Sequence, residues 1–164
     1  MLHVGLTGGI ASGKSTVAAM LEERGARLID FDVLAHEVEA PGRPAWKAVV
    51  AAFGEDVLLP DRTLDRAKLG AVVFSDPAKL RLLNECVHPH VLAEWERRIA
   101  AIRKSDPRAI VVSDIPLLIE VGMEDRVDVI VLVHVTPAEQ VARLERRNGI
   151  PREGAEARLA AQAP

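Results

Sequence analysis

The sequence has a single cysteine, no long apolar run and no excess of positive charge, and each absence narrows the possible functions. Because Cys86 stands alone, a disulfide within the chain is impossible and a cysteine-based zinc site is not expected. A reduced, cytoplasmic setting is the natural interpretation. No stretch reaches the length of a membrane-spanning helix, and the first residues lack the basic start and apolar core of a signal peptide. We therefore expect no membrane association.

The composition is that of an ordinary globular protein. The net charge is −3, so no general positive field favours binding to nucleic acid. Apolar residues make up 49% of the 164 residues and charged residues 27%, enough to bury a real core. We predict a single domain over residues 1–164 that acts on a small molecule, as a monomer or weak homo-oligomer.

Short apolar segments predict the strands of a parallel sheet. They are apolar without alternation, as strands buried on both faces are, and they cover residues 2–6, 26–30, 109–114 and 127–135. Helical patterns lie between them, among them residues 14–24 and 137–147. Thr136 is expected to cap the second of these helices, and Pro137 suits its first turn. Strands that alternate with helices predict an α/β fold.

A long segment, residues 31–108, separates the second and third predicted strands and is mostly helical in pattern. One helix is expected to end at Gly54, and a longer helical run is expected to bend near Pro89. We interpret this segment as a helical insertion on the sheet rather than a separate domain. Such insertions commonly hold a second substrate.

Residues 8–15 read GGIASGKS directly after the first predicted strand, which is the spacing of a phosphate-binding loop. Glycines let backbone N–H groups turn inward, and with the following helix N-terminus they form a positive cradle for phosphate. Lys14 adds a mobile cation, and the Ser15 hydroxyl can ligate a Mg²⁺ that bridges the phosphates. The alternative is a glycine-rich turn with an exposed lysine. The predicted nucleotide contacts are Gly9, Ile10, Ala11, Ser12, Gly13, Lys14, Ser15 and Thr16.

The loop alone does not identify a reaction, but missing motifs exclude some classes. The DxxG and NKxD segments of GTPases are absent, and residues 8–13 do not fit the G-x-G-x-x-G pattern of a dinucleotide-binding site. A phosphotransferase or an ATPase remains.

Aspartates follow two predicted strands at the edge where α/β sheets bind ligands. Asp32 can take or orient the proton of an acceptor hydroxyl, or it can cap a helix that starts at Val33, and the two roles are compatible. Asp30 is assigned to orienting the loop or contacting metal-bound water. Asp114 resembles the acidic strand end that helps hold Mg²⁺, with a turn aspartate as the alternative.

Arginines in the helix predicted over residues 137–147 are candidates for binding phosphate. Arg143 and Arg147 lie one turn apart on the same face, so an anion between them would relieve their repulsion. We predict that they stabilise charge on the transferring phosphoryl group, the alternative being a solvated arginine face. His88 and Leu117 can contact the substrate, although a helix end at His88 and core packing of Leu117 are the alternatives.

Taken together, these segments resemble the dephospho-CoA kinase family. The Thr-Gly-Gly-Ile start, the Asp-x-Asp segment and the Pro-Leu-Leu segment are together more specific than the phosphate loop alone. The matching stretches follow the family's order and cover nearly the whole chain: GLTGGIASGKST (5–16), IDFDVLAHEV (29–38), PGRPAW (41–46), LDRAKLGAVVFSDP (64–77), HPHV (88–91), DIPLLIE (114–120) and QVARLERRNG (140–149).

The resemblance implies a P-loop kinase-like three-layer fold with a parallel sheet in the order 2-3-1-4 and a helical CoA-binding insertion over residues 31–108. It implies that ATP phosphorylates the ribose 3′-hydroxyl of dephospho-CoA, giving CoA and ADP. Asp32 would be the base, and residues 137–161 would form a mobile lid that carries Arg143 and Arg147. The residues expected at the acceptor are Thr7, Asp32, His88 and Leu117, and those at Mg²⁺ are Ser15 and Asp114.

Some positions depart from the family pattern. His36 stands where the family often has arginine, which would weaken a contact to a substrate phosphate because neutral imidazole does not replace a guanidinium fork. Ile119 replaces the usual phenylalanine, a mild packing change. Family members also continue beyond this sequence with a fifth strand and a final helix that edge the adenine pocket. Without them, residues 129–135 would form an exposed sheet edge.

The shortened end leaves alternatives open. The chain is either truncated, or an impaired kinase, or a nucleotide-binding module without turnover whose missing edge another subunit supplies. A further alternative is a P-loop kinase for another small hydroxyl compound, such as a sugar acid or a nucleoside.

Overall fold

The computed structural model describes residues 1–149 and 151–160, and the chain divides into two compact units. The first unit comprises Met1–Asp30 and Ser105–Pro164, and the second comprises Phe31–Lys104. The predicted lid, residues 137–161, belongs to the first unit, but its residues 150 and 161 lie outside the described part of the chain. Among the described residues, no helix has the length and apolar character needed to cross a bilayer.

The first unit is built on a four-stranded parallel sheet in the order β2-β3-β1-β4, which confirms the predicted α/β fold and strand order. The central strands β1 and β3 are buried along most of their length, as continuous apolar runs require. The prediction of a buried strand is wrong for β4, which has no buried residue because it lies at the edge of the sheet. The observed bounds differ from the predicted ones by a residue or two. The strands are β1 (Leu2–Gly8), β2 (Arg27–Asp30), β3 (Ile110–Asp114) and β4 (Val129–Val133).

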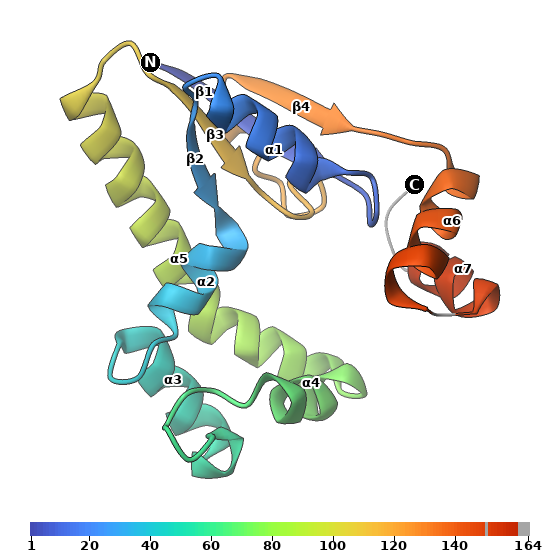
Figure 1. Ribbon diagram of the computed structural model, residues 1–164. Coiled ribbons are helices and arrows are strands. Elements are labelled where there is room, and N and C mark those ends of the chain that lie inside the picture. Colours follow the sequence, from blue (N-terminus) through green and yellow to red (C-terminus); the bar gives the residue numbers. More distant parts are fainter. Residues whose placement is uncertain (150, 161–164) are drawn as a thin grey trace. The chain divides into compact units, whose positions relative to one another are not determined.

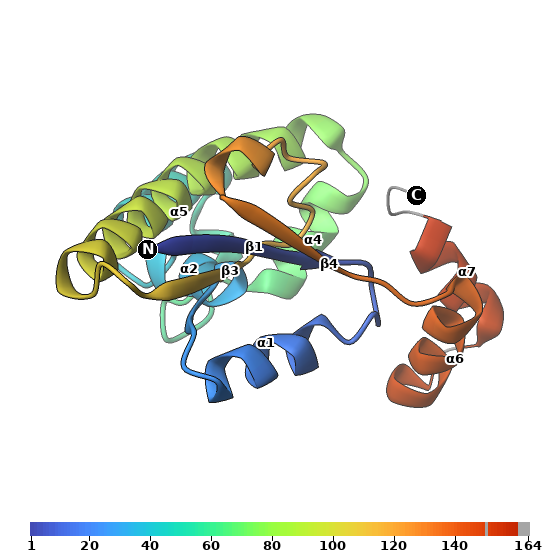
Figure 2. The same ribbon diagram turned by 90° about the horizontal axis from the view of Figure 1, so that it is seen from above.

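Helix α1 (Lys14–Glu23) covers one face of this sheet (Figures 1 and 2). Ala18 of α1 is buried in a core cluster with Val4 and Leu6 of β1 and Val112 of β3. This packing holds the N-terminus of α1 directly beyond the carboxyl end of β1, where the phosphate loop lies.

Helices α6 (Pro137–Asn148) and α7 (Arg152–Ala160) follow β4 and pack against each other. The Thr136 hydroxyl accepts a hydrogen bond from the Glu139 N–H at 3.3 Å, and Pro137 occupies the first turn, so the predicted start of α6 is confirmed. Gly149 ends the helix with a left-handed φ of 60°. No separate helix was predicted for the residues of α7.

The second unit is helical. Gly54 ends α3, as predicted. Helix α5 runs through Pro89 without a break, so the alternative in which His88 ends a helix is wrong. The elements are α2 (Phe31–Val38), α3 (Pro44–Phe53), the short 3-10 helix η1 (Glu55–Val57), α4 (Arg66–Phe74) and α5 (Pro77–Ser105), whose last residue belongs to the first unit.

Aromatic and ionic contacts join α2 to α5. Phe31 meets Trp95 edge to face, with ring centroids 5.6 Å apart. Glu37 of α2 forms an ion pair with Arg98 of α5. These contacts fix α2, and with it Asp32 in its first turn, on the long helix of the second unit.

Gly5 lies in β1 where neighbouring side chains leave no room for a methyl group. A β-carbon there would lie 2.5 Å from Leu118 Cδ1 and 3.1 Å from Val127 Cγ2. We expect Gly5→Ala to lower the free energy of unfolding by about 1–3 kcal/mol in urea denaturation, because overpacking forces neighbours to move. The matched control is Gly70→Ala inside α4, where a β-carbon meets nothing within 4 Å and stability should rise by about 0.5–1 kcal/mol. Equal effects of the two substitutions would contradict this packing.

Candidate active site

The loop between β1 and α1 turns sharply at two residues with positive φ. Gly13, the residue before α1, has a φ of 93°, which glycine adopts freely. Ala11 has a φ of 56°, which a residue with a β-carbon resists. Because Gly13 has no side chain to cap the helix, the first N–H groups of α1 can serve an anion instead.

Close packing also requires glycine at position 8. A β-carbon on Gly8 would lie 2.6 Å from the Val133 carbonyl oxygen and 2.8 Å from Ser12 Oγ. Ser12 is 4% exposed, and its hydroxyl has no hydrogen-bond partner within the described part of the chain. The loop therefore encloses a buried polar group whose hydrogen-bonding capacity is unused, which is costly.

Lys14 and Asp114 form an ion pair in which Nζ donates to Oδ1. Lys14 begins α1 and Asp114 ends β3, so the pair joins the loop to the neighbouring strand. The two side chains are 20% and 8% exposed, so the pair is largely shielded from water. The structure thus brings together the predicted phosphate-binding lysine and the predicted metal ligand of the sheet edge.

Helix α6 contacts the backbone of the loop. Gln140 Nε2 donates to the Ile10 carbonyl at 2.8 Å. Arg143 Nη1 donates to the Ser12 carbonyl at 3.1 Å and to the Ala11 carbonyl at 3.4 Å. One of the two predicted lid arginines is therefore bound to the loop itself.

Glu139 orients the Arg143 guanidinium. Its Oε1 accepts from Arg143 Nε at 2.7 Å and from Arg146 Nη2 at 3.3 Å. The hydrogen bond from Arg143 is the main reason that the pKa of Glu139 lies below its usual value. Arg147, which was predicted to act with Arg143, is exposed. The two predicted arginines therefore have different surroundings in this structure.

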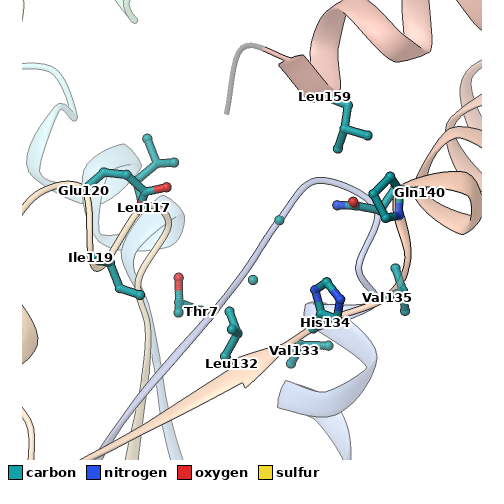
Figure 3. A pocket seen from close by; sticks show the side chains of 13 residues that line it. Thr7, Leu117, Ile119, Glu120, Leu132, Val133, His134, Val135, Gln140 and Leu159 are labelled. Carbon is teal, nitrogen blue, oxygen red and sulfur yellow. The ribbon is translucent and has the colours of Figure 1, made fainter. Parts of the chain in front are cut away.

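A cavity of about 310 Å³ opens beside the loop within the first unit. Figure 3 shows Glu120 and Leu117 on one side of it and Gln140 and Leu159 on the other. Thr7, at the end of β1, also lines it, so two of the residues predicted at the acceptor, Thr7 and Leu117, share one cavity.

The core-packing alternative for Leu117 is wrong. Leu117 exposes 45% of its surface and adopts a φ of 55°, whereas its neighbour Leu118 is fully buried. The left-handed turn at Leu117 directs successive side chains differently, so that Leu118 enters the core and Leu117 faces the cavity.

Asp32 and His88 belong to the second unit, and both are exposed. The predicted cap of a helix at Val33 is wrong, because α2 begins at Phe31 and Asp32 lies in its first turn. The chain enters α2 directly from Asp30, the last residue of β2, so Asp32 has a helical rather than a capping conformation.

The oxygen-bearing side chains beside the loop suit a metal ion that needs few protein ligands. Ser15 and Thr16 are exposed in the first turn of α1, and Asp114 lies at the end of β3. Within residues 1–149 and 151–160, no group of three or more His, Cys, Asp or Glu side chains could hold a metal ion. A hydroxyl and a carboxylate suit Mg²⁺, which typically completes its shell with water and phosphate oxygens.

Gln140 is a site residue that the sequence analysis missed. It is 8% exposed and lies on the buried face of α6 with Val141 and Leu144. The available signal was a polar amide at an apolar position of an amphipathic helix, a place where a buried polar group needs a partner.

A profile of the dephospho-CoA kinase family matches residues 2–164 of this chain. A dephospho-CoA kinase of Syntrophus aciditrophicus (strain SB) is 57% identical over 162 residues, which are 99% of this chain and 69% of that protein. One from Geobacter metallireducens is 52% identical over 164 residues, 100% of this chain and 81% of that protein.

Solved structures show the same fold. The crystal structure of TT1252 from Thermus thermophilus is 38% identical with a TM-score of 0.78, covering 99% of this chain and 81% of that one. The dephospho-CoA kinase from Campylobacter jejuni is 23% identical with a TM-score of 0.64, covering 96% of this chain and 78% of that one.

Lys14→Met removes the cation that faces Asp114 and leaves the carboxylate largely shielded from water. We expect the free energy of unfolding to fall by roughly 2–4 kcal/mol in urea denaturation. The double variant Lys14→Met/Asp114→Asn also removes the negative charge and should recover most of this loss. Both variants lack the Lys14 ammonium, so calorimetry should show a lower affinity for inorganic triphosphate than in the wild type. A single variant as stable as the wild type would contradict the ion pair.

Proposed function

The chain belongs to the dephospho-CoA kinase family, and on this premise we propose that it transfers the γ-phosphoryl group of ATP to the ribose 3′-hydroxyl of dephospho-CoA, giving CoA and ADP. The observation that carries the proposal is the loop before α1, with Lys14 and Asp114 paired beside it. Phosphoryl transfer asks for little covalent chemistry, so the protein contributes chiefly positioning and electrostatic stabilisation. The proposed enzyme acts on small molecules in the cytoplasm, as a monomer or weak homo-oligomer.

Lys14 and the loop backbone hold the phosphates of ATP. The N–H groups at the start of α1 offer donors, and the Lys14 ammonium exchanges its carboxylate partner for phosphate oxygens. Arg143 and Arg147 lie on α6 within the lid, and their guanidinium groups stabilise charge on the phosphoryl group in transit.

Ser15 and Asp114 are the residues that would hold Mg²⁺. There the ion would supply positive charge that offsets the negative charge of the phosphates. Movement of Lys14 from Asp114 to the phosphates exposes the carboxylate to the site, which is where a divalent cation would find it.

Asp32 accepts or orients the proton of the 3′-hydroxyl. Its carboxylate is exposed in the first turn of α2, and the contacts of α2 with α5 keep that turn in place. The second unit, residues 31–104, carries the pantetheine-bearing acceptor, with His88 among its contacts. Thr7 and Leu117 contact the acceptor from the cavity of the first unit.

The Arg66 guanidinium lies beside His36, the position where the family often has arginine. Its Nη2 donates to His36 Nδ1 at 3.0 Å and forms an ion pair with Glu39 Oε2 at 2.5 Å. We propose that Arg66 exchanges Glu39 for a substrate phosphate and so makes the contact that neutral imidazole cannot make.

Direct measurement of CoA formation tests the proposed acceptor. The wild type with Mg²⁺ and ATP is expected to convert dephospho-CoA to CoA, followed by chromatography, and to leave adenosine and gluconate unmodified. Preferred phosphorylation of either alternative acceptor would overturn the assignment, and tight ATP binding with no product would favour a module without turnover.

Asp32→Asn is expected to lower kcat by about 10²–10⁴-fold, the range for loss of a general base, and to leave the KM for ATP unchanged. The matched control is Asp56→Asn, an isosteric change at an exposed aspartate of the same unit, which should leave kcat unchanged. ADP release measures both. An Asp32→Asn enzyme with wild-type kcat would remove Asp32 from the mechanism.

Ser15→Ala is expected to raise several-fold the Mg²⁺ concentration required for half-maximal rate, because one oxygen ligand is lost. The KM for dephospho-CoA should not change. Titrating wild type and variant with Mg²⁺ at fixed ATP gives the comparison, and superimposable curves would rule Ser15 out as a ligand.

A further inference from the structure

Side chains of α6 donate hydrogen bonds to the carbonyl groups of the phosphate loop. A loop that turns N–H groups toward a phosphate directs neighbouring carbonyls away from it, and those carbonyls need donors of their own. Here the carbonyls of Ile10, Ala11 and Ser12 accept from side chains of α6. Gln140 gives the shortest of these bonds, 2.8 Å to Ile10.

Burial makes the Gln140 hydrogen bond consequential. The side chain is 8% exposed and lies among the buried residues of α6, at the margin of the cavity. An amide in such a place is unfavourable unless it is hydrogen-bonded. The hydrogen bond to the Ile10 carbonyl therefore accounts for an amide at this buried position, which packing alone does not explain.

An apolar cluster reinforces the same contact. Val141, Leu144 and Ala155 of the helix pair α6–α7 are buried together, and Ile10 and Ala11 pack against them. Ala11 holds a φ of 56°, a conformation that persists in a non-glycine residue only where its surroundings enforce it. The helix pair supplies such surroundings at the tip of the loop.

We propose that Gln140 is a positioning residue for phosphoryl transfer: its amide holds the Ile10 carbonyl and thereby keeps the loop in the shape that binds the phosphates of ATP. The inference rests on the proposed kinase function and extends it. Because the Gln140 amide carries no charge, its role is to position the loop backbone and not to stabilise charge on the phosphates. Arg143, one turn further along α6, supplies the charge.

Gln140→Met tests the proposal, because methionine keeps the length and bulk of the side chain and removes the donor. We expect the affinity for Mg²⁺-ADP, measured by calorimetry, to fall about five- to tenfold, as the loss of one buried hydrogen bond implies. The KM for ATP should rise by a similar factor. Wild-type affinity in this variant would overturn the proposal.

Thr136→Ala separates loop positioning from helix stability. It removes the hydroxyl that caps α6 and leaves the Gln140 bond in place. We expect a lower melting temperature with unchanged Mg²⁺-ADP affinity. If this variant weakens Mg²⁺-ADP as much as Gln140→Met does, Gln140 acts only by stabilising α6 and the proposal is wrong.

Gln140→Glu adds a pH signature. A carboxylate can only accept, so it repels the Ile10 carbonyl, whereas a protonated carboxyl can donate to it as the amide does. We expect the deficit in Mg²⁺-ADP affinity, relative to wild type, to shrink as the pH falls from about 8 to about 5. A deficit that is constant with pH would contradict the hydrogen-bonding role. The titration needs no acceptor, so these outcomes are independent of whether the wild type phosphorylates dephospho-CoA.

Discussion

The site depends on the backbone conformation of residues 9–13. A short loop that gathers N–H groups for an anion requires positive φ at Ala11 and Gly13, and it leaves no space for a side chain at Gly8. The surrounding structure satisfies these requirements. The buried strand β1 delivers the loop to the sheet edge, α1 begins at its end, and α6 binds its outward carbonyls.

The ion pair between Lys14 and Asp114 explains how a charged site is maintained without its substrate. A carboxylate at the end of β3 would be costly if it were shielded from water without a cation, and a free lysine would lose its position beside the loop. Each side chain therefore stabilises the other in this structure. In the proposed kinase, Lys14 would turn to the phosphates of ATP, and Asp114 with Ser15 would hold Mg²⁺, whose charge would offset that of the phosphates.

The parts of the fold that follow from local signals could be predicted from the sequence. Apolar runs without alternation identify the parallel strands, although not the exposure of β4 at the sheet edge, and the spacing of Gly8, Gly13 and Lys14 identifies the phosphate loop. Features that depend on contacts distant in sequence could not be predicted. Nothing near Gln140 in the sequence shows that the Ile10 carbonyl needs a donor. The helical conformation of Asp32 depends on how β2 continues into α2, and helix boundaries are poorly determined by propensity alone.

The apolar cluster that Ile10 and Ala11 share with Leu144 and Ala155 makes loading of the loop and docking of α7 reciprocal. By thermodynamic linkage, if bound nucleotide strengthens the docking of α7 by some factor, docked α7 strengthens the binding of nucleotide by the same factor. A spectroscopic probe on the outer surface of α7, remote from the chemistry, would thus report occupancy of the loop.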